Sequence, residues 1–274
     1  MKLPEFENHP LNEVAMAVQF APLQHLHTPR LGALWQLFRS RFPSVEEHPP
    51  LEPQFEVFPS PPTSGVNVRL ETHPPRPRVW FLTTDGAQLV QIQNDRFIRN
   101  WRRSEGMTAA SYPRYSKLRE EFEKDAGLFA DFLARDGGGE PKINQCELTY
   151  INQVAPCAVW KTHAEFSRVF PWVTNKQIAT LPMESEDGQF LLRFILRDAA
   201  NAPVGRLAVV VQPAFARDTG EPRFIFRLTV RGAPSGVSID SALKFFDAGH
   251  AMIVKAFDAL TSAEMHAAWR KKNA

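Results

Sequence analysis

The chain has few cysteines, and they are not arranged for a structural role. Only two, Cys146 and Cys157, occur in 274 residues, whereas a secreted disulfide scaffold uses more of them in a shorter chain. They form no CxxC pair, so the spacing typical of a zinc site is missing. We therefore expect two reduced thiols near one strand, and no metal.

Long apolar segments are also scarce. The stretch LAVVV at 207–211 is far shorter than the roughly 20 residues of a membrane-spanning helix. The opening MKLPEFENHPL lacks the apolar core of a secretory signal peptide. We expect a cytoplasmic, soluble protein with no membrane association.

Neither sign of charge dominates. Lys and Arg total 32 and Asp and Glu total 30, which leaves a formal net charge of +2. A protein that binds nucleic acid over its whole surface carries a larger positive excess. Hydrophobic residues make up 43% of the chain, enough for a core of ordinary size. The composition predicts a folded globular protein.

Proline is abundant but unevenly distributed. Ten of the 23 prolines fall between Pro43 and Pro77. Proline fixes φ and lacks an N–H, so this segment cannot form a long helix or a central strand throughout. Edge strands and extended connections are expected, with short strands at 54–58 and 66–70.

Clearer periodicity begins at Val79. The apolar runs on either side of Asp85-Gly86 predict a β-hairpin, because Asp-Gly between such runs is a strong hairpin signal. Apolar residues then recur every three to four positions with a charged opposite face, which predicts a helix over 114–134.

The same order of elements is predicted twice. The first half has a strand, a helix, about four strands and a long helix, at 13–20, 30–42, 54–94 and 114–134. The second half repeats this order with a short helix, and its elements are expected at 146–154, 163–170, 177–183, 189–197, 205–213, 223–231 and 239–260. We predict an α+β fold of two β-α-β4-α halves, 1–140 and 141–274, with two long helices packed on an antiparallel sheet. This order is similar to that of TBP-like and helix-grip folds, and the analogy carries no function by itself.

A basic and aromatic segment at 94–119 is the first candidate for function. Its cations could hold phosphates and its rings could stack on bases. The candidate residues for a ligand or a nucleic acid are Arg96, Arg99, Trp101, Arg102, Arg103, Tyr112, Arg114 and Tyr115. The alternative is an exposed strand end and loop, whose charge is offset by the acidic helix that follows.

A histidine in the last helix is the second candidate. His250 falls on the apolar stripe of this helix, and Asp247 precedes it by one turn, so a hydrogen bond between them is geometrically allowed. A buried His–carboxylate pair could transfer protons. The alternative, which we expect, is a largely buried, hydrogen-bonded, structural histidine. No nucleophile motif or phosphate-binding loop accompanies the pair, so no catalytic residue and no cofactor is assigned.

Polar residues around the central strand are a third candidate. Asn144, Gln145, Glu147 and Asn152 could face a cavity. The alternative is an ordinary strand edge that joins the two halves.

Several motifs in combination resemble an uncharacterised, sporadically distributed bacterial protein family. They are NEVAMAVQF, DRFIRNW, YPRY-x-x-L-x-x-x-F, NQCELTYIN and the closing D-x-x-H-x-x-x-x-x-x-F-x-x-L-T with Trp269. The likeness covers nearly the whole chain and implies no catalytic residue and no cofactor. Sporadic distribution suggests an accessory role, such as defence or a toxin–antitoxin system.

Taken together, these features predict a non-catalytic accessory protein that binds a partner protein or a small ligand. One alternative is a nucleic-acid-binding protein that uses the segment 96–119. A second alternative is an enzyme that uses Asp247 and His250.

Overall fold

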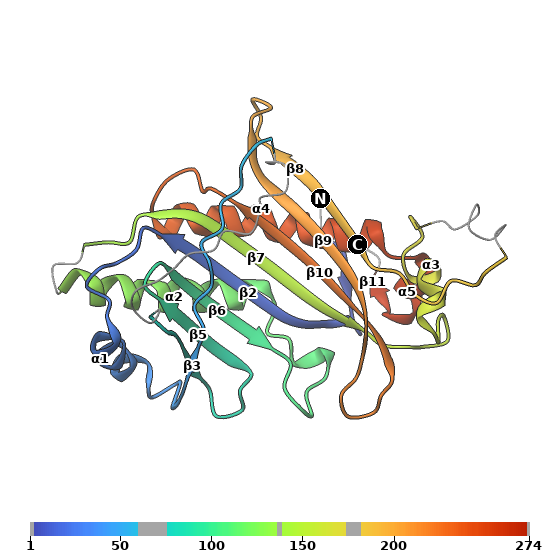
Figure 1. Cartoon of the computed structure of the whole chain (residues 1–274), viewed down its shortest axis with the longest axis horizontal. Coiled ribbons are helices and arrows are strands. Elements are labelled where there is room, and N and C mark those ends of the chain that lie inside the picture. The colour runs from blue at the N-terminus through green and yellow to red at the C-terminus, as the bar shows by residue number, and fades with distance from the viewer. Residues whose placement is uncertain (1–2, 60–75, 136–138, 174–181, 273–274) are drawn as a thin grey trace.

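A nine-stranded sheet built from most of the chain dominates the structure (Figure 1). This computed structural model describes residues 3–59, 76–135, 139–173 and 182–272. The strands of the sheet are β2 (Leu11–Phe20), β3 (Ser44–His48), β4 (Arg78–Leu82), β5 (Gln88–Gln93), β6 (Arg96–Arg102), β7 (Ile143–Val154), β8 (Phe190–Arg197), β9 (Pro203–Phe215) and β10 (Pro222–Gly232). Their order is β3-β4-β5-β6-β2-β7-β10-β9-β8, and all neighbours are antiparallel.

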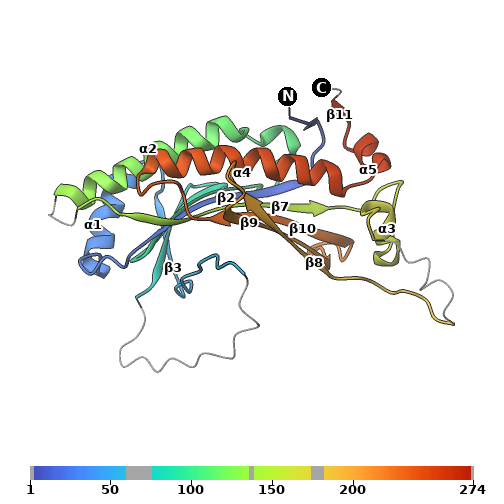
Figure 2. The same ribbon diagram turned by 90° about the horizontal axis from the view of Figure 1, so that it is seen from above.

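Two long helices, α2 (Tyr115–Arg135) and α4 (Ile239–Leu260), lie side by side on one face of this sheet (Figure 2). The shorter helices are α1 (Thr28–Phe38), α3 (Phe166–Val169), α5 (Ala263–Ala268) and the 3-10 helices η1 (Ala109–Ser111) and η2 (His163–Glu165). A small second sheet pairs β1 (Glu5–Phe6) with β11 (Lys271–Lys272). Among the described helices, none has both the length and the apolar character needed to cross a membrane.

The core lies between the two long helices and the sheet. Phe122 of α2 meets Phe246 of α4 edge to face, with 5.0 Å between ring centroids, and it packs on Phe97 of β6 at 5.7 Å. Phe122 and Phe257 are both buried, as the helical spacing predicts. Gly249 is buried where α4 faces the sheet, and a Cβ at this position would make ordinary van der Waals contact with β10 and β7 side chains.

A cluster of charges is buried within this core. The Nε of Arg99 on β6 lies 2.9 Å from Oδ2 of Asp125 on α2, and the two side chains are 2% and 0% exposed. Arg99 also contacts Glu121 at 2.7 Å, and Arg41 forms a second ion pair with Asp125. Charges this deeply buried require partners, so the cluster ties α2 to the strand beneath it.

The α+β class, the large antiparallel sheet and the two long helices packed on it are confirmed. The predicted helices at 114–134 and 239–260 agree with α2 and α4 to within one residue. The strands predicted at 189–197, 205–213 and 223–231 agree with β8, β9 and β10 to within two residues. The predicted short helix near 163–170 is formed by η2 and α3. Strands β2 and β7 pair at the middle of the sheet and join the segments 1–140 and 141–274.

The strand predicted at 54–58 is wrong, and the strand of this region is β3 instead. The backbone around residue 54 bonds to side chains rather than to a strand. The N–H of Leu51 donates to Gln93 Oε1 at 2.9 Å, and the N–H of Gln54 donates to Gln19 Oε1 at 3.0 Å. These side chains satisfy an extended, proline-rich segment without a ladder.

Two further elements differ from the prediction or cannot be compared with it. The helix expected over 30–42 ends at Phe38 and is followed by a turn in which the N–H groups of Arg41 and Phe42 donate to the Phe38 carbonyl. Pro43 disfavours helical backbone at the residue before it. The strand predicted at 66–70 lies outside the described residues, as does most of the one predicted at 177–183.

Candidate functional site

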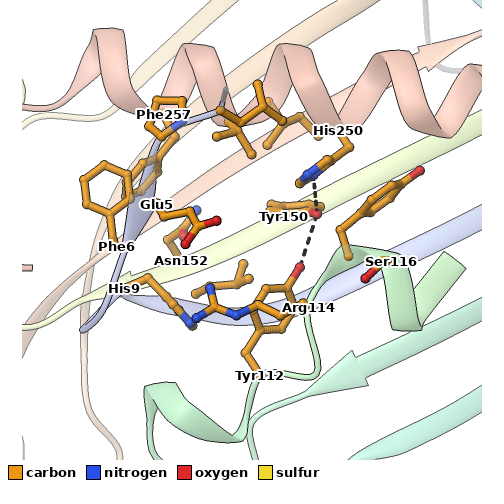
Figure 3. Close-up of a pocket in the computed structure, with 16 residues that line it drawn as sticks. Glu5, Phe6, His9, Tyr112, Arg114, Ser116, Tyr150, Asn152, His250 and Phe257 are labelled. Carbon is orange, nitrogen blue, oxygen red and sulfur yellow. Dashed lines mark hydrogen bonds between the residues drawn. The ribbon is translucent and has the colours of Figure 1, made fainter. Parts of the chain in front are cut away.

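A cavity of about 580 Å³ lies between α4, the start of α2, β7 and the N-terminal segment (Figure 3). Its apolar lining includes Phe6, Ile253, Val254 and Phe257. Its polar lining includes His9, Tyr112, Arg114, Tyr115, Ser116, Tyr150, Asn152 and His250. Arg114 and Ser116 are exposed, so the cavity reaches the molecular surface.

The N-terminal wall of the cavity is held by the C-terminal end of the chain. Pairing of β1 with β11 sets Phe6 opposite Lys271. The ring of Phe6 packs edge-on against Phe257, with 5.3 Å between centroids, and against Trp269 at 6.1 Å. This aromatic cluster fixes the wall to α4 and α5.

A chain of hydrogen bonds crosses the floor of the cavity. The hydroxyls of Tyr112 and Tyr150 lie 3.4 Å apart, and the hydroxyl of Tyr150 lies 2.8 Å from Nδ1 of His250 (Figure 3). The ring of Tyr115 stacks on the His250 ring, with 4.0 Å between centroids and 6° between planes. The sequence contains three tyrosines, and all three line this one cavity.

These groups are uncharged at neutral pH, and burial widens the pH range over which they stay so. It raises the pKa of Tyr112 to about 12 and the pKa of Tyr150 well above its ordinary value. It lowers the pKa of His250 to about 4, against the opposing effect of the Asp247 carboxylate. The floor therefore offers neutral donors and acceptors rather than fixed charges.

His9 is the least satisfied polar group of the cavity. Its side chain is 9% exposed, and neither ring nitrogen has a hydrogen-bond partner of good geometry among the described residues. The ring lies edge-on to Tyr112, with 5.3 Å between centroids. Burial, with the nearby charges of Arg103 and Arg114, lowers the pKa of His9 to about 4. A buried polar group without a partner calls for an explanation, and a bound ligand is one.

Arg114 stands at the entrance in a strained backbone conformation. Its φ is +71°, a region that residues other than glycine rarely adopt, and it lies between Pro113 and the first residue of α2. Its carbonyl accepts the N–H of Leu118 at 3.2 Å, so it directly precedes the first turn. Its exposed guanidinium forms no ion pair with the described residues. Such strain is typical of positions that serve a function.

The two residues of the second candidate have different partners. His250 is half-buried and bonded to Tyr150, as described above. The carboxylate of Asp247 instead accepts from the hydroxyl of Tyr115 at 2.7 Å and from Nε of Arg119 at 2.9 Å. Asp247 therefore links α4 to α2 at the surface, while His250 faces the cavity.

The basic segment does not form one surface. Alternation along β6 turns Arg99 and Trp101 toward the helices, where both are buried. Arg96 points to the other face and donates to Gln19 and to the Glu52 carbonyl.

Of the remaining cations in this segment, Arg102 and Arg103 donate to backbone carbonyls, and Arg114 is exposed. Arg102 donates to the Gly86 carbonyl at 2.7 Å, and Arg103 donates to the carbonyl of His9 at 3.2 Å. Of the eight predicted ligand residues, Tyr112, Arg114 and Tyr115 line the cavity. Of the third candidate group, Asn152 also lines it, whereas Gln145 and Glu147 border a smaller pocket of about 130 Å³ elsewhere.

Both cysteines are free, as predicted. A comparison of the chain with protein-family models, curated proteins and solved structures finds no match.

Lowering the pH from about 6.5 to 4 should destabilise the protein through His9 and His250. Both titrate near 6.5 when unfolded, whereas burial holds each folded pKa at about 4. The unfolded chain therefore binds protons that the folded chain does not, so stability present above pH 6.5 is lost as the pH falls toward 4. With solvent screening, we expect about 1–2 kcal/mol for each histidine.

Urea denaturation at pH 7 and at pH 4.5 measures this loss. A His250→Gln variant should lose less stability between the two pH values than the wild type. An unchanged pH dependence in that variant would show that His250 carries no such linkage.

Proposed function

We propose that the protein is a non-catalytic binding protein that takes up a small organic ligand in this cavity. The observation that carries the proposal is the convergence of all three tyrosines, with His9 and His250, on one cavity that has an apolar side. Ligand sites are typically concave, mostly apolar and equipped with a few convergent polar groups. The aromatic rings offer stacking surfaces, and the neutral floor offers hydrogen bonds.

The electrostatics support recognition over proton-transfer chemistry. The Asp247 carboxylate, which the enzyme alternative pairs with His250, is engaged by Tyr115 and Arg119. The nucleic-acid alternative is weakened because Arg99 is enclosed by Asp125 and Glu121.

We also propose that the fold is an internal duplication of TBP-like or helix-grip type. Its support is that β2 and β7 begin the two halves at the centre of the sheet, and that each half ends in a long helix on the same face. Membership of the bacterial family, a cytoplasmic location and an accessory role in defence or a toxin–antitoxin system stay predictions from the sequence, as does a partner protein.

Filling the cavity should abolish uptake of a small apolar probe. Val254 lines the cavity, whereas Met252 on the same helix is 39% exposed and does not line it. We expect wild type and Met252→Trp to bind the neutral fluorophore N-phenyl-1-naphthylamine alike, and Val254→Trp to bind it at least about tenfold more weakly, since the indole occupies the space. Fluorescence titration measures this.

A second variant tests the same site independently, in case Val254→Trp does not fold. Ser116 is an exposed position at the cavity mouth, so Ser116→Trp obstructs entry without altering the core. Lys117→Trp, one residue further along α2, is its control, and thermal melts establish that each variant is folded. Unchanged probe affinity in both folded cavity variants would refute the binding site.

A further inference from the structure

We propose that the ligand of this cavity is an amphiphilic organic anion, an apolar body with one terminal anionic group. This inference rests on the proposed function and adds the chemical class of the ligand. The anionic group would lie at the Arg114 end, between the start of α2 and His9. The apolar body would lie against Phe6 and Phe257.

Uncompensated positive potential at one end of the cavity is the first observation. The first N–H groups of an α-helix have no partner within the helix, and the helix dipole places partial positive charge there. The first turn of α2 contains no acidic side chain, and its residues Tyr115 and Ser116 line the cavity. The guanidinium of Arg114 adds a full charge at the same place without an ion pair among the described residues.

His9 is the second and independent observation. It is nine-tenths buried, and its ring lies beside the Arg114 side chain in the close-up (Figure 3). Both ring nitrogens lack a partner of good geometry among the described residues. The backbone carbonyl of Ala109 lies near the ring and partly offsets the lowering of its pKa, but it makes no hydrogen bond of good geometry with it. A neutral imidazole always carries one N–H, so an anionic oxygen bound here would accept that N–H in a better geometry.

The backbone of Arg114 is the third observation. Its left-handed φ would suit glycine or asparagine, which adopt this region at lower cost. Arginine at this position accepts that cost and places a cation at the cavity mouth.

The remaining charges around the cavity set the orientation of the ligand. Asp247 pairs with Arg119, which also contacts Glu123, and its carboxylate accepts the Tyr115 hydroxyl on the α2–α4 surface. Arg103, which donates to the His9 carbonyl, adds positive charge at the His9 end. Glu5 lines the cavity from β1 and is the one described acidic lining residue, so it disfavours an anion close to its own carboxylate.

The test compares two matched fluorescent probes in the full-length protein. 1-Anilinonaphthalene-8-sulfonate carries a sulfonate, and N-phenyl-1-naphthylamine is its neutral counterpart. Arg114→Asn removes the cation but tolerates the left-handed backbone. Lys117→Asn removes an exposed cation from the first turn of α2 that does not line the cavity. The readout is the ratio of the two dissociation constants.

We expect Arg114→Asn to weaken the sulfonate probe by about tenfold or more and to leave the neutral probe within about twofold. Lys117→Asn should change neither, and Glu5→Gln should strengthen the sulfonate probe alone. An unchanged ratio in Arg114→Asn would overturn the anion assignment. Binding of the sulfonate probe that survives Val254→Trp would overturn it too, because the probe would then lie elsewhere.

The two proposals fail in different ways. If Val254→Trp and Ser116→Trp leave the affinity for the neutral probe unchanged, the proposed binding function is wrong. If both variants weaken binding of the neutral probe but Arg114→Asn leaves the ratio of dissociation constants unchanged, the binding function is supported and only the class of ligand is wrong.

Discussion

Asp125→Ala should destabilise the protein by about 3 kcal/mol, because it removes the acceptor of a buried guanidinium. Asp125 is fully buried and forms ion pairs with Arg99 and Arg41. Without it, Nε of Arg99 has no acceptor in a side chain that is only 2% exposed. Glu121 still contacts the other end of that guanidinium, so we place the loss at the lower end of the range for broken buried pairs.

Urea denaturation at neutral pH gives the measurement. Asp131→Ala is the control, an exposed acid of the same helix, and its effect should stay within about 0.5 kcal/mol. A double variant, Arg99→Met with Asp125→Leu, should recover part of the loss, because an apolar pair of similar volume avoids the cost of burying charge. A loss below about 1 kcal/mol in Asp125→Ala would mean that Arg99 finds water or another acceptor.

This ion pair shows what the sequence could and could not predict. The spacing of apolar residues located α2 and its buried stripe. It did not reveal that Asp125, which falls within that stripe, is buried as a charge. Arg99 was likewise counted among exposed cations, because alternation along a strand does not tell which face is covered. Only the pairing of β6 with its neighbours places the two charges together.

The candidate site was predicted in separate pieces. Tyr112, Arg114, Tyr115 and His250 were all named, but the first three as part of a basic surface and the last as half of a carboxylate pair. They meet because α2 and α4 lie side by side, a contact between residues more than a hundred positions apart. Local periodicity carries no information about such a contact.

Other residues of the site were missed altogether. His9 and Phe6 lie in an N-terminal segment without a periodic signal, and Tyr150 falls within the strand predicted at 146–154. One compositional signal was there to find. The chain has 21 phenylalanines but only three tyrosines, so few of its large aromatic side chains carry a hydroxyl. All three occupy the cavity, where a hydroxyl can be satisfied by a neighbour or by a ligand.

The strand prediction in the proline-rich region was wrong for a different reason. Alternating apolar residues at 54–58 imitate a strand, yet strand pairing needs a partner with free backbone groups. Within this segment, the N–H of Gln54 donates to the side chain of Gln19 on β2, and the carbonyl of Val57 accepts from Arg206 on β9. The sequence of a segment does not show which distant side chains will bond to its backbone.

Phe122→Ala should cost about 3–5 kcal/mol of stability and leave probe binding intact. Phe122 is fully buried and contacts Phe97 of β6 and Phe246 of α4, so its removal opens a void where two helices and the sheet meet. The loss combines the transfer energy of the ring with the cavity left behind, and denaturation in urea measures it.

The matched variant is Phe257→Ala, which truncates the same side chain on the wall of the binding cavity. Phe257 packs on Phe6, Phe226 and Trp269, and it lines the cavity that Phe122 does not reach. Phe257→Ala should therefore lower both stability and the affinity for N-phenyl-1-naphthylamine, whereas Phe122→Ala lowers stability alone. Equal probe affinities in the two folded variants would place the probe outside the cavity, and a loss below about 1 kcal/mol in Phe122→Ala would contradict the packing of α2 on the sheet.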